Sequence, residues 1–470
     1  MQNLSPTIIL SVILGYFLVL VLISHFTSGD GDNKTFFTAN RNSSWLLVSI
    51  GMIGASLSGV TFVSIPGLIG KESGANINFS YMQMVLGYLL GYAFIALVLL
   101  PIYYNRNLTS IYTYLDQRLG TSAYKVGAFY FLLSRIVGAS FRLYLVSMTL
   151  DIFVTGPLGI PFFLTVIITI ILIWIYTYKG GIKTIVVTDA FQTISMLTAV
   201  ILTIVAITKA LNTDMSGMLD IISQQEYTQM FYFEDGWGDP NNFFKQFISG
   251  ALMAIVMTGM DQDMMQKNLT CRSLKDAQKN IFFFSIVLVF ANLLFLTLGA
   301  LLYTYAANIG VAIPESSDQL YPLLALKHLP ATVGIFFVLG LIAAAYSSAD
   351  SALTSLTTSF CVDFLGLDKK YDNVNSKKTR IFVHLGFSIV LFLVILAFNA
   401  YNDDSVITQI FIAAGYTYGP ILGLFSFSIL TNRQVNNSMV ILICILSPIL
   451  SYIINYFSPT LLGGFEWGFL

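Results

Sequence analysis

A hydroxyl-rich stretch with an acidic residue at its centre lies between residues 343 and 359. Ser347 and Ser351 are four residues apart, so they share one face of a helix, with Asp350 beside them. Hydroxyl, carbonyl and carboxylate oxygens are the ligands that suit a hard cation. The hydroxyls could instead bond to the preceding helical turn, as they often do in membrane helices. The acid favours an ion site, because a charge inside a membrane helix costs about 2.5–3.5 kcal/mol or more.

Two further segments contain residues that interrupt helices. Segment 45–69 is the stronger case, with Gly51, Gly54, Ala55, Ser56, Ser58, Gly59, Thr61, Ser64, Pro66 and Gly67. Segment 243–266 is interrupted more mildly, with Ser249, Gly250, Thr258 and Gly259 before Asp261-Gln262-Asp263. Weak helices at corresponding positions of two halves of a chain point to the binding site of a transporter. The alternative is that the small residues only allow helices to pack closely.

The elements that carry these residues must cross a membrane. Of the 470 residues, 56% are hydrophobic and only 10% are charged, whereas soluble domains have about 25% charged residues. Apolar runs near the length needed to cross about 30 Å of hydrocarbon recur along the whole chain. We predict an all-α polytopic membrane protein with twelve spans, at 7–26, 45–69, 79–102, 122–154, 159–177, 184–209, 243–266, 279–306, 331–365, 379–398, 405–430 and 438–457.

These spans predict one transmembrane domain over 1–470. Span 7–26 is expected to be a retained leading helix. A signal peptide has positive charge before its apolar run, and no positive charge precedes this span. Five spans fall in 45–209 and five in 243–430, and an odd number of spans per half requires the two halves to be inverted. Region 438–470 is expected to hold a C-terminal helix and, from Glu466 onward, the beginning of a final helix that has been cut short.

Lysine and arginine residues predict the orientation of the chain. With the N-terminus outside, 17 of the 23 fall in inside loops and three (Lys71, Lys209 and Lys327) in outside loops. Positive residues accumulate on the cytoplasmic side, so we expect the N-terminus outside. The long acidic loop 210–242 is then external, whereas a six-plus-six carrier would have a basic central loop in the cytoplasm.

Other classes of protein receive little support. The net charge of −1 gives no indication of nucleic-acid binding. The three cysteines show neither a disulfide framework nor the spacing of a zinc site. The three histidines are scattered, so we do not expect an enzyme. An ion channel or a substrate sensor remains an open alternative, since ion coordination alone does not establish coupled transport.

Three motifs resemble those of the sodium:solute symporters, the relatives of the sodium–glucose, sodium–proline and sodium–sialic acid cotransporters. Residues 179–192 resemble the GG…TD..Q signature, 259–267 (GMDQDMMQK) a second signature, and 344–363 the sodium-site helix. The similarity of organisation covers essentially the whole chain. It implies a LeuT-like inverted five-plus-five repeat with a leading helix, a site at the membrane midplane and alternating access. It also implies Na+ as the coupling ion and a bacterial-type inner (plasma) membrane as the location.

The resemblance implies a sodium site shared across the family. Two backbone carbonyls of the interrupted second span, three residues apart, bind the ion together with a carbonyl and two hydroxyls of the ninth span. In this sequence these positions are Gly54, Leu57, Ala344, Ser347 and Ser348.

The sialic-acid branch of the family implies a second cation site. Its signature carboxylate and the hydroxyls one turn beyond the shared site correspond here to Asp189, Asp350 and Ser351, and Asp350 departs from the branch pattern. Two nearby carboxylates could hold a second sodium ion, or share a proton because like charges disfavour full ionisation. Asp350 could also be structural, paired with a neighbouring donor.

Six side chains are expected by analogy to face the substrate cavity: Ser56, Ser58, Thr61, Phe79, Gln83 and Arg135. Phe79 and Gln83 resemble the Phe-x-x-x-Gln pair of sialic-acid carriers. Arg135 corresponds to an arginine that meets the substrate carboxylate, which suits the fork of a guanidinium. Arg135 could instead form a salt bridge to an intramembrane acid such as Asp189. For Arg142 we expect a structural pairing or snorkelling rather than substrate contact.

The expected solute is a small organic acid, an acidic sugar such as sialic acid or another small carboxylate. Sugar carriers of the family use bulky aromatics in the seventh span, where this chain has Met257-Thr258-Gly259-Met260. That difference disfavours a neutral sugar or polyol, which remains the alternative. The expected partners are the solute, sodium ions and the lipid bilayer, and no obligate protein partner is indicated.

Overall fold

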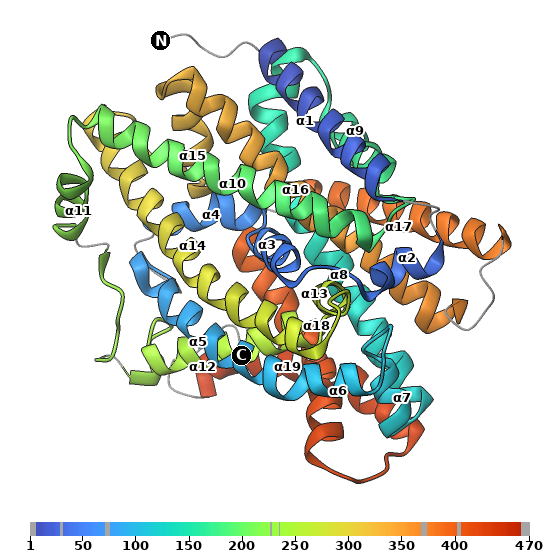
Figure 1. Ribbon diagram of the computed structural model, residues 1–470. Helices are drawn as coiled ribbons and strands as arrows, with labels where there is room; N and C mark the ends of the chain where they lie inside the picture. The colour runs from blue at the N-terminus through green and yellow to red at the C-terminus, as the bar shows by residue number, and fades with distance from the viewer. Residues whose placement is uncertain are drawn as a thin grey trace.

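The computed structural model is helical throughout the residues that it describes, which are 6–28, 32–70, 76–225, 228–234, 236–367, 374–401 and 406–461 (Figure 1). Within these ranges the only strand-like contact is an isolated bridge between Ser43 and Cys271. The final apolar segment expected from Glu466 onward lies outside the described residues.

The predicted spans are present as helices. The unbroken ones are α1 (Pro6–Thr27), α5 (Tyr81–Phe94) continued by α6 (Leu100–Asn105), α8 (Thr121–Leu150), α9 (Phe162–Thr177), α10 (Ile182–Ala210), α14 (Leu274–Asn308), α16 (Ala331–Ser359), α17 (Val374–Tyr401), α18 (Val406–Leu430) and α19 (Asn437–Leu461). Short helices in the connections are α2 (Asn33–Thr38), α7 (Thr113–Leu119), α11 (Met215–Ser223) and α15 (Leu320–Leu323). In the described part of the chain, nine helices are long and apolar enough to cross a membrane.

Both segments with helix-interrupting residues are broken spans. Helix α3 (Trp45–Ser56) meets α4 (Gly59–Leu68) at a bend of 55°, and Phe243–Gly259 meets α13 (Gln262–Asn268) at 69°. The first part of that second span is α12 (Phe243–Ala254). The two pairs raise the number of candidate spans to eleven, and the 16-residue helix α9 supplies the twelfth predicted segment. α9 begins at Phe162, later than predicted, because Pro161 holds an extended backbone before it.

The backbone at each break explains why the helix stops. Leu57 has φ −81° and ψ 73°, and Ser58 is extended, so the last carbonyls of α3 lose their intrahelical partners. In the other pair, Asp261 is extended and caps α13, its carboxylate accepting the backbone N–H groups of Asp263 (2.9 Å) and Met264 (3.3 Å). The first break therefore leaves backbone groups inside the molecule where a ligand could reach them. At the second break Asp261 caps the amides, and the hydroxyls of Tyr103 and Tyr112 donate to the backbone oxygens of Gly259 and Met260.

Small residues in the same segments also allow close packing. A Cβ on Gly54 would lie 2.2 Å from the hydroxyl oxygen of Thr193, where α3 packs on α10. A Cβ on Gly250 would lie 2.1 Å from the carbonyl oxygen of Met84, where α12 crosses α5. Both interpretations of the small residues are therefore correct, because these glycines pack the very helices that are broken.

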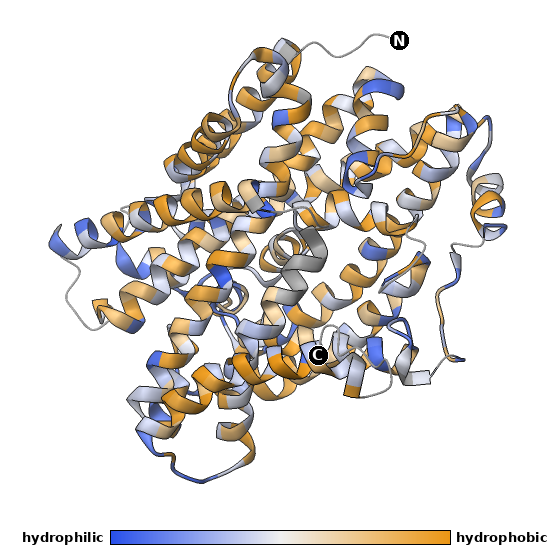
Figure 2. Ribbon diagram, turned by 180° about the vertical axis from the view of Figure 1, so that it is seen from behind, coloured by the Kyte–Doolittle hydropathy of each residue, from blue (hydrophilic) through white to orange (hydrophobic). Residues whose placement is uncertain are grey.

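The burial of the helices separates the centre of the molecule from its lipid-facing edge. In α16 72% of the most apolar stretch is buried inside the protein, against 11% in α19. Figure 2 shows hydrophobic residues along the outer helices. The hydroxyl-rich helix α16 therefore lies at the centre, where its polar side chains face other helices and not lipid.

Candidate functional site

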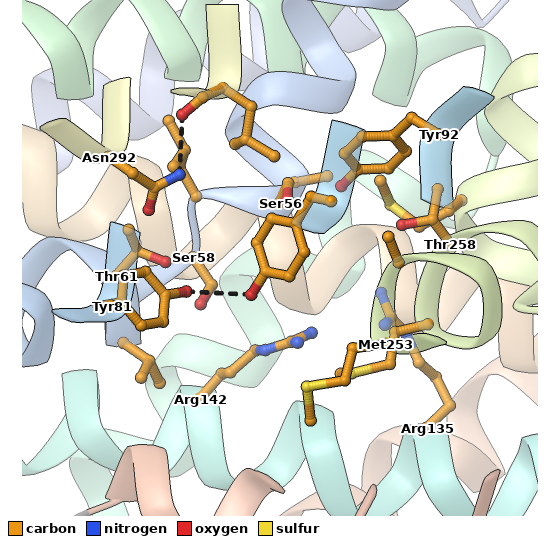
Figure 3. A pocket seen from close by; sticks show the side chains of 18 residues that line it. Ser56, Ser58, Thr61, Tyr81, Tyr92, Arg135, Arg142, Met253, Thr258 and Asn292 are labelled. Carbon is orange, nitrogen blue, oxygen red and sulfur yellow. Dashed lines mark hydrogen bonds between the residues drawn. The ribbon is translucent and has the colours of Figure 1, made fainter. Parts of the chain in front are cut away.

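A cavity lies at the break between α3 and α4, with about 830 Å³ of empty space when the open solvent at its mouth is included (Figure 3). Residues of α5, α8, α12 and α14 complete its wall. Its polar lining consists of Ser56, Ser58, Thr61, Tyr81, Tyr88, Tyr92, Arg135, Arg142, Thr258 and Asn292. The cavity thus offers hydroxyls, an amide and two guanidinium groups, which suits a polar solute that carries negative charge.

Four of the six predicted substrate residues line this cavity, and Phe79 and Gln83 do not. The Gln83 side chain donates to the backbone oxygen of Asn241 at 2.8 Å and accepts the backbone N–H of Tyr232 at 3.1 Å. Phe79 is buried in the turn that precedes α5. Gln83 therefore fastens the loop that leads into α12, a contact between distant segments that residue spacing could not predict.

Three tyrosines of the cavity wall were missed in the sequence. Tyr81, Tyr88 and Tyr92 are separated by seven and four residues, so they follow one face of α5. The hydroxyls of Tyr81 and Tyr88 lie 3.3 Å apart. In α14, the Asn292 amide donates to the carbonyl oxygen of Leu288 at 2.8 Å. The helical spacing of the tyrosines was the signal that could have revealed them.

Arg135 is held by two carboxylates. Its guanidinium forms ion pairs with Asp261, at 3.9 Å, and with Asp263, and all three side chains are buried. Asp261 also accepts the hydroxyl of Tyr418 at 2.6 Å, and Asp263 accepts that of Ser351. The alternative of a salt bridge to an intramembrane acid is therefore the one observed, but the partner is not Asp189. This cluster joins α8, α13, α16 and α18.

Arg142 differs from Arg135 although it lies two turns further along the same helix. No carboxylate among the described residues forms an ion pair with Arg142, and no hydrogen bond is recorded for it there. Its side chain reaches toward the middle of the cavity (Figure 3). Arg142 thus forms no ion pair within 4.0 Å in the described part of the chain, although the charge of Asp261, a partner of Arg135, also acts on it.

The residues predicted for the shared sodium site meet where α16 faces the end of α3. The hydroxyl of Ser347 donates to the backbone oxygen of Gly54 at 3.0 Å, and both residues are buried. The hydroxyl oxygen of Ser348 is buried and has no hydrogen-bond partner in the described structure. Leu57 lies in the break itself, and Ala344 precedes Ser347 by about one helical turn. This is a cluster of hard oxygen donors in the helix break.

The residues predicted for a second cation site each have a protein partner. The Asp189 carboxylate lies 2.6 Å from the ammonium nitrogen of Lys267, and both side chains are fully buried. Asp350 accepts the hydroxyl of Tyr176 at 2.7 Å, which realises the structural pairing considered for it. Ser351 donates to Asp263, as described above. These residues thus take part in separate contacts between neighbouring helices.

A polar cavity at the break of a membrane-spanning helix is the architecture of a secondary transporter. Residues 36–441 match the sodium:solute symporter family, and the chain belongs to this family. Membership confirms the family resemblance drawn from the three motifs.

Individual relatives are distant in sequence. The chain is 24% identical to the sodium/sialic acid symporter NanT of Aliivibrio fischeri, covering 86% of this chain and 78% of the relative. It is 23% identical to the sodium/sialic acid symporter SiaT of Proteus mirabilis, with 92% and 86% covered. It is also 23% identical to the human sodium/iodide cotransporter, with 84% of this chain covered but only 61% of the relative's length.

The fold agrees with a solved structure, the substrate-bound outward-open state of a Na+-coupled sialic acid symporter. The TM-score is 0.81 at 20% sequence identity, with 98% of this chain and 93% of the other covered. This similarity confirms the predicted fold class, an all-α membrane protein with the LeuT-like arrangement.

Proposed function

We propose that this chain cotransports sodium with a small anionic solute by alternating access, and that the solute is an acidic sugar such as sialic acid or a comparable small carboxylate. The observation that carries the proposal is the guanidinium of Arg142, which enters the cavity and forms no ion pair within 4.0 Å among the described residues. The names of two relatives, both sodium/sialic acid symporters, support it.

The role of substrate anchor passes from Arg135 to Arg142 in this proposal. Arg135 already faces two carboxylates, so it has no net charge to offer an anion. A guanidinium binds a carboxylate through two parallel N–H donors, and such a pair is strong where water is excluded. Ser56, Ser58 and Thr61 would then meet the hydroxyls of the solute, on the side of the cavity formed by the helix break.

Sodium is proposed to bind at Gly54, Leu57, Ala344, Ser347 and Ser348. The ion would replace the present hydrogen bond between Ser347 and Gly54 and engage the unpartnered hydroxyl of Ser348. It would thereby hold the end of α3 against α16 and complete the cavity wall. Sodium shifts the balance between two conformations only by binding one of them more tightly. Coupled transport follows if the carrier changes between its outward-open and inward-open states readily when it is empty or holds both sodium and solute, and does not do so when it holds sodium alone.

With the N-terminus outside, in a bacterial-type inner membrane, α13 lies on the inner side of its break. The ion pairs of Arg135 with Asp261 and Asp263 then close the path from the cavity to the cytoplasm. Release of the solute inward would require these contacts between α8 and α13 to separate. Arg135 would act as a latch below the cavity, and Arg142 as the residue that holds the solute.

A neutral sugar or polyol is the second candidate solute, and one observation favours it. Tyr81, Tyr88 and Tyr92 form an aromatic side of the cavity on α5, although the seventh span lacks the bulky aromatics expected of sugar carriers. Aromatic faces and hydroxyls are also a suitable surface for a sugar ring. The two candidates differ in their need for Arg142.

Thermal unfolding of the purified protein tests the proposal. The protein is heated with sialic acid, with a small monocarboxylate or with a neutral amino sugar, in sodium and in potassium. A ligand at about 100 times its dissociation constant adds about 2.7 kcal/mol to stability. Stabilisation by an acid, in sodium only, is the expected result. Stabilisation by the neutral sugar alone would establish the second candidate, and equal stabilisation by the acid in potassium would contradict sodium coupling.

A further inference from the structure

The buried ion pair between Asp189 and Lys267 has no role in the mechanism proposed above. Asp189 belongs to α10 and Lys267 to α13, and these helices pack against each other and against α3 and α16. The two side chains are 0% and 1% exposed, with 2.6 Å between carboxylate oxygen and ammonium nitrogen. A lysine is rarely buried completely unless it is paired.

This ion pair lies among the residues that are expected to hold a second sodium ion. The Lys267 ammonium interacts electrostatically with the carboxylate of Asp350 as well as with that of Asp189. Asp350 itself is oriented by the hydroxyl of Tyr176. Helix α3 closes the site from another side, since a Cβ on Gly51 would lie only 3.1 Å from the Cβ of Asp189. Lys267 is thus in direct contact with Asp189, and its charge also acts on Asp350.

The charge of a lysine is comparable to that of a sodium ion. Its ammonium is a compact point charge on a flexible stem, with three donors that can face several oxygens at once. A sodium ion placed beside Asp189 would meet a like charge at short range in a site closed to water, where such repulsion is strong. The ammonium and the ion therefore compete for one position.

We propose that the ammonium of Lys267 stands where a second sodium ion would bind, so that this chain couples one sodium ion, not two, to each solute. The statement that one sodium ion is coupled to each solute rests on the proposed symport function. The statement that Lys267 occupies the position of a second ion does not. Because the lysine is part of the chain, it would stay with the carboxylate of Asp189 and would not be released to either side as a sodium ion is. Only the sodium ion bound at α3 and α16 would then contribute to the driving force.

Counting the bound ions tests the inference directly. Binding of ²²Na+ to the purified full chain is measured to saturation, without any solute. We expect one ion per wild-type chain, and in Ser347→Ala one ion that binds about tenfold or more weakly. Lys267→Met should bind two ions, because the vacated position becomes available to sodium. Lys275→Met, which removes an exposed lysine nearby in the sequence, should still bind one.

Several outcomes would overturn the inference. Two ions bound to the wild-type chain, or only one bound to Lys267→Met, would show that the lysine does not replace an ion. If Lys267→Met does not fold, the number of ²²Na+ ions taken up per solute molecule is measured for wild-type protein in proteoliposomes. We expect one ion per solute, and two ions per solute would contradict the inference. Wild-type protein that binds no sodium at all would instead overturn the proposed symport function. The two failures are therefore distinguishable.

Discussion

At the scale of single residues, two arginines on one helix receive different roles from their surroundings. Arg135 and Arg142 are seven residues apart on α8 and lie nearly on the same face. The carboxylates of Asp261 and Asp263 form their contact ion pairs with Arg135, where the bend of 69° brings the beginning of α13 beside it. Seven-residue spacing alone could not show which of the two arginines is paired with carboxylates, and the predicted contact of Arg135 with the substrate stays a prediction.

Arg142→Gln should raise the KM for an acidic solute about 100-fold. A charge-assisted hydrogen bond contributes about 1.5–3 kcal/mol, and about 2.8 kcal/mol corresponds to a factor of 100. Sodium-dependent uptake into proteoliposomes measures this, with Arg142→Lys as the control that keeps the charge but not the fork. An unchanged KM in Arg142→Gln would remove this residue from the solute site.

Ser347→Ala should weaken sodium activation about tenfold or more, since it removes one oxygen ligand from the proposed ion site. The hydrogen bond to the backbone oxygen of Gly54, in the last turn of α3, is lost as well. The measurement is the sodium concentration that half-saturates solute uptake. Ser359→Ala, about three turns further along the same helix, serves as control. The same half-saturation in wild type and Ser347→Ala would place the ion elsewhere.

The contacts observed agree with the sequence where a motif fixed the position of a residue and differ where a loop decided it, and binding of the ion and the solute at these residues stays a prediction. The oxygens of Gly54 and Ser347 meet as expected, because the break of α3 and the hydroxyls of α16 are both visible in the sequence. Gln83 is engaged by Asn241 and Tyr232, which are about 150 residues away. Such a contact depends on the path of the outer loop, and no local pattern encodes it.

At the scale of elements, the two broken spans set the position of every charged side chain in the centre. Asp261 both caps α13 and approaches Arg135, so a local helix signal and a long-range ion pair depend on one carboxylate. Both breaks could be predicted from the glycine, proline and hydroxyl residues. The bend angles could not, because they follow from packing against α5, α8 and α10.

Arg135→Gln should destabilise the protein by about 3–5 kcal/mol. Removing one partner of a buried ion pair leaves an uncompensated charge, here the neighbouring carboxylates of Asp261 and Asp263. The double variant Arg135→Gln/Asp263→Asn should recover a substantial part of the loss. Thermal unfolding of wild type, Arg135→Gln, Asp263→Asn and the double variant measures the coupling free energy between Arg135 and Asp263. Independent, additive effects would contradict the ion pair.

Gly250→Leu should prevent α12 from packing on α5. Its Cβ would fall 2.1 Å from the backbone oxygen of Met84, so the helices must separate, and inserting bulk into a packed interface costs about 1–3 kcal/mol or more. The yield of monodisperse protein in detergent and its unfolding temperature measure the effect. Gly138→Leu on α8, where no atom lies within 4 Å of a Cβ, is the matched control. Equal loss in both variants would argue against a specific crossing.

At the scale of the whole molecule, the fold class and the family follow from features distributed along the chain. The low charge, the recurring apolar runs and three separate motifs all agree with the helices observed and with the match over residues 36–441. The boundaries of the two inverted halves, 45–209 and 243–430, remain predictions. The number of coupled ions and the nature of the solute depend on a few side chains in the centre, so the overall resemblance does not fix them.

The most direct measurement of the central claim is uptake of radiolabelled sialic acid into proteoliposomes that contain the purified protein. An inward sodium gradient is compared with an equal potassium gradient, and wild type with Arg142→Gln. The account predicts accumulation above equilibrium in sodium only, and its loss in the variant. Accumulation of the acid at the same rate in potassium, or undiminished in Arg142→Gln, would contradict it.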